Sequence, residues 1–237
     1  MGKSSRNPAV FVCIFAITLI LCISANTALA ASIDTTPDWN GSFFISSFGY
    51  TNTATYGQTL VRPAAGDKLT DFTFNISVTS GSIDFRGYVY AWDEGNNRAV
   101  GPALYESATV TRTTGATYDP VVFTMPGDGL QFMPGQMYVL FVSHSRVAGN
   151  TDSGSRFAAI GDNASCVPGN FVFINNGIDD TQWTASPWTP IMNDLSFTAN
   201  FTDLQPIPTV NEWGMILLIS LLGISGVYYA RKNTMAS

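Results

Sequence analysis

The sequence predicts an all-β fold, an antiparallel β-sandwich that is jelly-roll-like, flanked by one apolar segment at each end. Apolar and polar residues alternate with a period of two from Leu69 to Val78 and again from Leu195 to Phe201, which is typical of strands that bury one face. Clusters of Gly, Pro, Asn and Asp separate the runs, and helical periodicity is absent between Ala31 and Asp203. Many short strands with frequent turns favour a sandwich over a closed barrel.

The first segment, residues 1–30, has the organisation of a secretory signal peptide. Lys3 and Arg6 precede an apolar stretch, which is followed by small residues ending in Ala28-Leu29-Ala30. This order of charge, apolar run and small residues predicts cleavage before Ala31. A lipoprotein signal is not expected, because Leu21 rather than a small residue precedes Cys22.

Residues 31–203 are expected to form one domain, because about 173 residues are enough for a single buried core. The expected strands are Phe43–Phe48, Gly57–Val61, Leu69–Val78, Phe85–Trp92, Ala103–Arg112, Pro120–Met125, Gln136–Ser145, Arg156–Ile160, Asn170–Ile174 and Leu195–Phe201. The expected turns between them are Ala65-Gly66-Asp67, Ser80-Gly81, Gly95-Asn96-Asn97, Pro126–Gly129, Met133-Pro134-Gly135 and Asn175-Asn176-Gly177. The pattern does not define the order of the strands in the sheet.

Charge and cysteine content narrow the range of partners for this domain. It carries seven cationic side chains against sixteen acidic ones, an imbalance that repels nucleic acid. Cys13 and Cys22 lie in the signal peptide, so Cys166 is the one cysteine expected in the exported chain and no internal disulfide is expected. The fold therefore depends on packing rather than on cross-links.

The C-terminal segment is predicted to be a membrane anchor. Residues 204–214 form a linker rich in proline, residues 215–230 an apolar helix, and residues 231–237 a basic tail. From Trp213 to Ala230 a helix spans about 27 Å, close to the thickness of a bilayer core. Arg231 and Lys232 are expected on the cytoplasmic side, which places the β domain outside.

Within this segment, Ile207-Pro208-Thr209 and Trp213-Gly214 precede the helix. This arrangement resembles the IPTL-CTERM sorting signal of Gram-negative bacteria, with Val210 where that family usually has leucine. The resemblance implies an exosortase-type membrane transpeptidase as partner, and removal of the helix after export. The alternative is a permanent anchor, which explains the helix and the charges but not the motif.

The domain itself resembles a recurring ectodomain of PEP-CTERM-type exported proteins. The similarity rests on Gly57-Gln58-Thr59, on residues 85–105 and on Gly135–Val139. It implies a surface location and supplies no catalytic residues.

One turn is a candidate calcium site. Asp93, Glu94, Asn96 and Asn97 bring four oxygen-bearing side chains into one short segment, and oxygen atoms are the ligands that calcium prefers. The segment lacks the twelve-residue EF-hand pattern, and a plain hairpin turn is the alternative. No other cofactor is expected.

Trp183 and Trp188 form a second candidate. They stand among Thr, Ser, Pro and Asn residues, so they are either a platform on which sugar rings stack or a cap on an open end of the sandwich. Burial of large aromatic area favours the cap.

Few residues in this sequence fit a known catalytic arrangement. His144 is the only histidine and is expected at the surface, and no Gly-x-Ser-x-Gly elbow is present. Asp152-Ser153-Gly154 occurs once, whereas an aspartic protease needs two such carboxylates. Glu94 and Glu106 fit a glycosidase pair only if they converge across a cleft. The protein is therefore not expected to be an enzyme.

The sequence thus favours an exported structural or adhesive protein of the cell surface or extracellular matrix. The expected course is an inner-membrane precursor that is then displayed at the surface or secreted, with exopolysaccharide as a candidate partner. A carbohydrate-binding module using Trp183 and Trp188 is the alternative, and a hydrolase ranks third.

Overall fold

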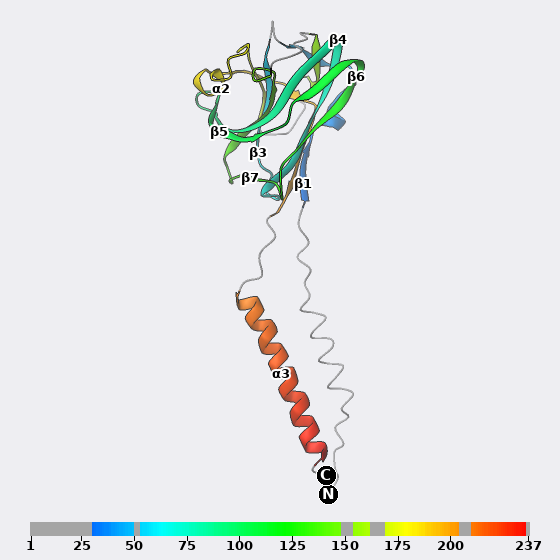
Figure 1. Ribbon diagram of the computed structural model, residues 1–237, viewed down its shortest axis with the longest axis vertical. Helices are drawn as coiled ribbons and strands as arrows, with labels where there is room; N and C mark the ends of the chain where they lie inside the picture. The colour runs from blue at the N-terminus through cyan, green and yellow to red at the C-terminus, as the bar shows by residue number, and fades with distance from the viewer. Residues whose placement is uncertain (1–29, 50–52, 148–153, 162–168, 204–209, 236–237) are drawn as a thin grey trace. The chain divides into compact units, whose positions relative to one another are not determined.

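A computed structural model describes residues 30–49, 53–147, 154–161, 169–203 and 210–235. The chain divides into a β-rich unit over residues 29–204 and a second unit that contains the C-terminal helix. The two units are described separately. The predicted antiparallel all-β fold is confirmed for the first unit, which is built as one large curled sheet (Figure 1).

The strands and helices follow one another along the chain in this order. They are β1 (Ala30–Asp34), the 3-10 helix η1 (Thr36–Asp38), β2 (Phe44–Phe48), β3 (Thr55–Val61), β4 (Lys68–Asp93), β5 (Arg98–Glu106), β6 (Val110–Thr124), β7 (Leu130–Gln131), β8 (Met137–Ser143), β9 (Ser155–Ile160), β10 (Phe171–Ile174), α2 (Gln182–Ala185), β11 (Thr189–Ile191), β12 (Asp194–Leu195), β13 (Phe197–Thr202) and α3 (Val210–Met235).

Strand β4 joins the two halves of the sheet. Its first part pairs with β13 and β9 on one edge and with β6 on the other. Its second part lies between β8 and β5, and β8 continues the sheet through β3 and β10 to β11. All of these pairs are antiparallel, and the long curved course of β4 beside β6 is visible in Figure 1.

The main core lies between the two halves. The alternating residues predicted to face inward, Phe72, Phe74, Ile76 and Val78 on β4, are all buried. Leu195, Phe197, Ala199 and Phe201 are buried in the same cluster, together with Phe85 and Val89 from the second part of β4. The predicted apolar face is therefore confirmed in both segments that showed the clearest alternation, although Ser77 and Ser196 on the polar face are buried too.

A second, smaller core covers the outer face of the second half. Tyr88, Tyr90 and Trp92 point away from the main core and pack with Phe141 beneath the segment that carries α2. Because β4 is buried on both faces here, its apolar residues lose the period of two. This half of the sheet therefore has a second hydrophobic layer that strand periodicity does not predict.

Two expected boundaries are wrong. Leu69–Val78 and Phe85–Trp92 are parts of one strand rather than two, because the chain bends at Gly81, where φ is 67°, without reversing. The expected strand Ala103–Arg112 is interrupted, since β5 ends at Glu106 and β6 begins at Val110. The register of β4 against β6 shifts between Val78 and Ser82, which accommodates the bend.

Candidate functional site

The C-terminal helix α3 is long and apolar enough to cross a membrane. Residues 214–234 have a mean hydropathy of 1.5 and are not buried against the rest of the chain. At 1.5 Å per residue they span about 31 Å, the thickness of a bilayer core. Side chains such as Leu218 and Leu222 are more than half exposed, as expected of a helix that is covered by lipid.

This helix begins earlier and ends later than expected. It starts at Val210, so Trp213 and Gly214 belong to its first turns rather than to a linker, and it continues past Arg231 and Lys232 to Met235. No proline follows Pro208, so nothing in the sequence interrupts a helix from Val210 onward. Ile207, Pro208 and Thr209 lie outside the described residues.

The serine hydroxyls of this helix are satisfied within it. Ser220 donates to the carbonyl of Ile216 at 2.8 Å, and Ser225 donates to that of Leu221 at 2.8 Å. A hydroxyl bonded to the preceding turn has no need of water. The two polar side chains are thus compatible with a membrane interior.

The candidate calcium turn is closed by its own hydrogen bonds. The Asp93 carboxylate accepts the backbone N–H of Asn96 at 3.2 Å and its side-chain amide at 2.6 Å. The hydrogen bond from the Asn96 side chain lowers the pKa of Asp93. Within the described part of the chain, no three His, Cys, Asp or Glu side chains form a group that could hold a metal ion. Glu94 and Asn97 lie in the same turn, and a calcium ion there would share the Asp93 carboxylate with Asn96.

The stacking platform suggested for Trp183 and Trp188 is wrong. Both side chains are buried, with 1% and 2% of their surface exposed. Trp183 packs 5.0 Å from the ring of Phe141, and its indole N–H donates to Thr55 Oγ1 at 3.1 Å. Trp188 lies 5.2 Å from the same ring. Their polar neighbours in sequence face solvent while the indoles cover the outer face of the sheet, rather than an open end.

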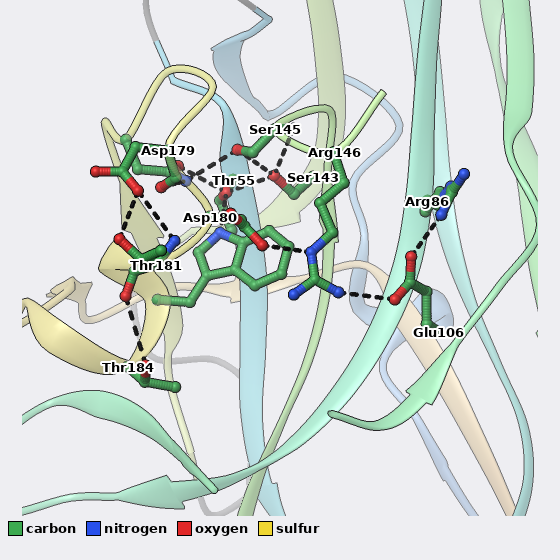
Figure 2. Close-up of polar contacts among 12 residues, drawn as sticks. Thr55, Arg86, Glu106, Ser143, Ser145, Arg146, Asp179, Asp180, Thr181 and Thr184 are labelled. Atoms are coloured by element: carbon green, nitrogen blue, oxygen red, sulfur yellow. Dashed lines mark hydrogen bonds and ion pairs between the residues drawn. The ribbon is translucent and has the colours of Figure 1, made fainter. Parts of the chain in front are cut away.

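A cluster of charged side chains links the segment that carries Trp183 to the sheet. Arg146 forms ion pairs with Asp180 and, at 2.8 Å, with Glu106, while Arg86 contacts the other oxygen of Glu106 at 2.5 Å. Figure 2 shows Arg146 lying between Asp180 and Glu106. Its guanidinium also lies 5.1 Å from the ring of Trp183. Each charge is neutralised within the cluster, so its arrangement is structural.

Beneath the cluster lies a buried network of hydroxyl and amide groups. Thr55 donates to Ser143 at 2.7 Å, Ser143 and Ser145 lie 2.8 Å apart, and the Asn176 amide donates to Ser145 at 2.9 Å. These residues come from β3, the end of β8 and the loop before α2. The sequence did not predict the network, because it joins three segments that are far apart in the chain.

The remaining catalytic candidates do not converge. His144 is 1% exposed rather than at the surface, and burial lowers its pKa. Glu106 is paired with Tyr88, whereas Glu94 follows Asp93 at the end of β4, so their backbones are roughly 20 Å apart at 3.3 Å per residue. That separation is too large for a glycosidase pair. Asp152, Ser153 and Cys166 lie outside the described residues.

A group of partly exposed aromatic side chains lies on the outer face of the other half. Trp39 and Tyr118 are in edge-to-face contact with their ring centroids 5.0 Å apart. The Arg156 guanidinium lies 4.3 Å from the ring of Phe44. We call Trp39, Phe44, Tyr118 and Arg156 the aromatic face.

Comparison with known proteins identifies the tail. Residues 205–232 match the family model described as the IPTL-CTERM motif. The chain carries an IPTL-CTERM sorting signal. The motif predicted from Ile207–Thr209 and Trp213-Gly214 is thereby confirmed, and it marks a surface-exported protein whose precursor is anchored by an apolar helix.

The other comparisons add little. No curated protein matches the chain. Among solved structures, it is similar to the cysteine protease and lectin-like domains of a surface layer associated protein of Clostridium difficile, with 15% identity and a TM-score of 0.36. The match covers 65% of this chain and 32% of that one. A likeness this weak carries no argument about activity, and the resemblance of the β domain to PEP-CTERM-type ectodomains stays a prediction.

Proposed function

We propose that an exosortase-type membrane transpeptidase recognises the IPTL-CTERM signal, removes α3 and leaves the β domain at the cell surface or in the extracellular matrix. There the domain acts as a structural or adhesive protein without enzymatic activity. The observation that carries this proposal is the IPTL-CTERM match over residues 205–232. The matched segment includes most of a helix that is long enough to cross a membrane.

The topology of the precursor follows from its charges. Arg231 and Lys232 lie in the last turns of α3, and basic residues are retained on the cytoplasmic side of a membrane helix. The opposite end of the helix, with Trp213, then lies at the outer surface of the inner membrane. A transpeptidase embedded in that membrane reaches the motif from the same side.

The structural role is supported by how the domain uses its ionisable groups. Arg86, Arg146 and Asp180 are bound to partners that hold the second core in place, and so is Glu106. In a hydrolase, carboxylates instead converge on a cleft with perturbed pKa values. A domain in which this group of charges serves packing is suited to a mechanical or adhesive role.

The sorting proposal is tested by changing the motif without changing the helix. We expect Pro208→Ala with Thr209→Ala, and separately Trp213→Ala, to leave export intact while the unprocessed precursor accumulates in the inner membrane. Membrane fractionation with immunoblotting measures the precursor and the released form. Tyr229→Ala is the matched control, because it removes an aromatic residue at the other end of the helix and should be processed normally.

If both motif variants are processed and released like the natural chain, the tail is only an anchor. If the natural chain itself is never shortened, the anchor is permanent. Either result overturns the proposal.

A further inference from the structure

The aromatic face is created by an irregularity in strand pairing. Ile76 of β4 is paired with Asp119 of β6, and Val78 is paired with Gly115. Three residues of β6, 116–118, therefore lie opposite the single residue Ser77. Such a bulge turns side chains out of the regular pleat, and here it brings Tyr118 against Trp39.

The position of Trp39 is fixed by the loop that carries it. The indole N–H donates to the carbonyl of Phe43 at 2.8 Å. Further back in the loop, Thr35 is buried and donates to the carbonyl of Leu195 at 2.8 Å. The ring is thus held in place before any ligand arrives, and a preorganised side chain binds at a lower entropic cost.

Arg156 supplies a positive charge beside these rings. It is paired with Ser77 across the sheet, next to the bulge, and its guanidinium covers Phe44 at 4.3 Å. The bulge that carries Tyr118 lies opposite Ser77 on the other edge of β4. Partial burial raises the pKa of Tyr118, and the positive charge of Arg156 opposes that rise. Arg156 therefore connects the two aromatic groups.

This arginine differs from most cations of the domain. Arg62, Lys68, Arg86, Arg98 and Arg146 each lie within 4.0 Å of a carboxylate. Within the part of the chain that the structure describes, Arg156 has no carboxylate at that distance. Among the described residues, the charge of Arg156 therefore faces an aromatic ring rather than a carboxylate, which allows it to pair with an anion from outside.

The surroundings of the face favour a sugar over an apolar protein surface. Phe44 is 37% exposed, Trp39 and Tyr118 are partly exposed, and the hydroxyl-bearing Ser42 and Thr117 nearby are exposed. A sugar ring has apolar C–H groups on its face and hydroxyls at its edge. The first suit the negative face of an aromatic ring, and the second suit polar side chains around it.

We propose that the aromatic face binds an acidic polysaccharide. Sugar rings stack on Trp39 and Tyr118, and the carboxylate of a uronic acid residue pairs with Arg156, whose planar guanidinium matches a carboxylate. This inference rests on the proposed function, because it presumes that the domain is exposed outside the cell. It corrects the location of the sugar site from Trp183 and Trp188 to the opposite half of the sheet.

The test uses the chain from Ala31 to Ser237, purified with its helix in detergent micelles. Binding to alginate, a polyuronate, and to dextran, a neutral glucan, is measured by biolayer interferometry at low and high salt. We expect alginate binding at high salt, where the repulsion between the acidic domain and the polyuronate is screened, and dextran binding at least about fivefold weaker. Tyr118→Ala and Arg156→Gln should each weaken alginate binding by at least about fivefold, the effect of losing one aromatic or charged contact.

Arg98→Gln is the matched control, because it removes the same charge from the start of β5 and should bind like the natural chain. Thermal melting of each variant shows whether it is folded, and Arg156→Lys, which keeps the charge but loses the planar fork, should bind with intermediate affinity. No alginate binding, or equal loss in Arg98→Gln and Arg156→Gln, overturns the proposal. Since the assay needs no sorting enzyme, its failure is distinguishable from failure of the sorting proposal.

Discussion

Gly87 and Phe123 are in direct contact across the main core. A Cβ atom added to Gly87 would lie 2.3 Å from Cδ1 of Phe123, and 2.5 Å from its Cε1. Phe123 is itself buried and stacks on Phe72 with the ring centroids 4.8 Å apart. The second part of β4 thus approaches β6 so closely that only a residue without a side chain fits at position 87.

We expect Gly87→Ala to destabilise the domain by about 1–3 kcal/mol, the usual result of forcing extra volume into a packed core. Urea denaturation followed by tryptophan fluorescence measures the free energy of unfolding. Gly115→Ala is the control, because the nearest atom to its added Cβ would be 3.9 Å away. Equal stability of the two variants would show that the two halves of the sheet are not packed this closely.

The buried residues of a strand were predictable where one face of the sheet packs in the core and the other faces solvent. From Leu69 to Val78 the alternation identified the buried apolar residues correctly, because burial on one face imposes a period of two. It did not predict that Ser77, on the polar face, is buried as well. It failed where a second layer covers the outer face. There Tyr88 and Tyr90 are buried as well as Val89, and only the tertiary structure shows which segment covers them.

Functional side chains were harder to predict, because they come together through the fold. Trp183 lies among polar residues in the sequence and yet is buried, since those neighbours face away from the sheet. Trp39 and Tyr118 are far apart in the chain, and the bulge that joins them depends on strand register. The sorting motif was predictable, because a linear signal carries its chemistry in consecutive residues.

The domain over residues 31–203 should fold without either terminal segment. The main core consists entirely of side chains between Ala31 and Phe201, and the first strand is held by pairing with the last one, as in Ser32 with Asn200. We expect a monomer with a β-dominated far-ultraviolet circular dichroism spectrum and a cooperative melt. A spectrum with substantial helix would contradict the fold, since α2 covers only Gln182–Ala185 in this unit.

Calcium is expected to leave the stability of this domain unchanged. Both oxygens of the Asp93 carboxylate already accept hydrogen bonds from Asn96, and within the described chain no third acidic, His or Cys side chain joins Asp93 and Glu94 in a group that could hold a metal ion. Thermal melting with and without calcium, in the natural chain and in Asp93→Asn, measures the effect. If the turn does bind calcium, the natural chain gains about 2.7 kcal/mol at 100 times the dissociation constant. A stabilisation that Asp93→Asn abolishes would therefore establish a calcium site.

The domain should lose stability at alkaline pH through Tyr56. This side chain is 2% exposed and packs 5.1 Å from the ring of Phe171; burial raises its pKa from 10.0 to about 12. In the unfolded chain the phenol ionises near pH 10, so above that pH the unfolded state releases its proton first and is favoured. The stabilising contribution is complete below pH 10 and is lost as the pH rises toward 12.

A shift of two pKa units corresponds to about 2.7 kcal/mol. We expect Tyr56→Phe to show a smaller loss of unfolding free energy between pH 10 and 12, because phenylalanine keeps the ring but has no proton to release. Urea denaturation across this range, with ultraviolet absorbance to follow phenol ionisation, measures the difference. Parallel stability profiles for the two proteins up to pH 12 would mean that the Tyr56 hydroxyl titrates as it does in water, and that this ring is not in the core.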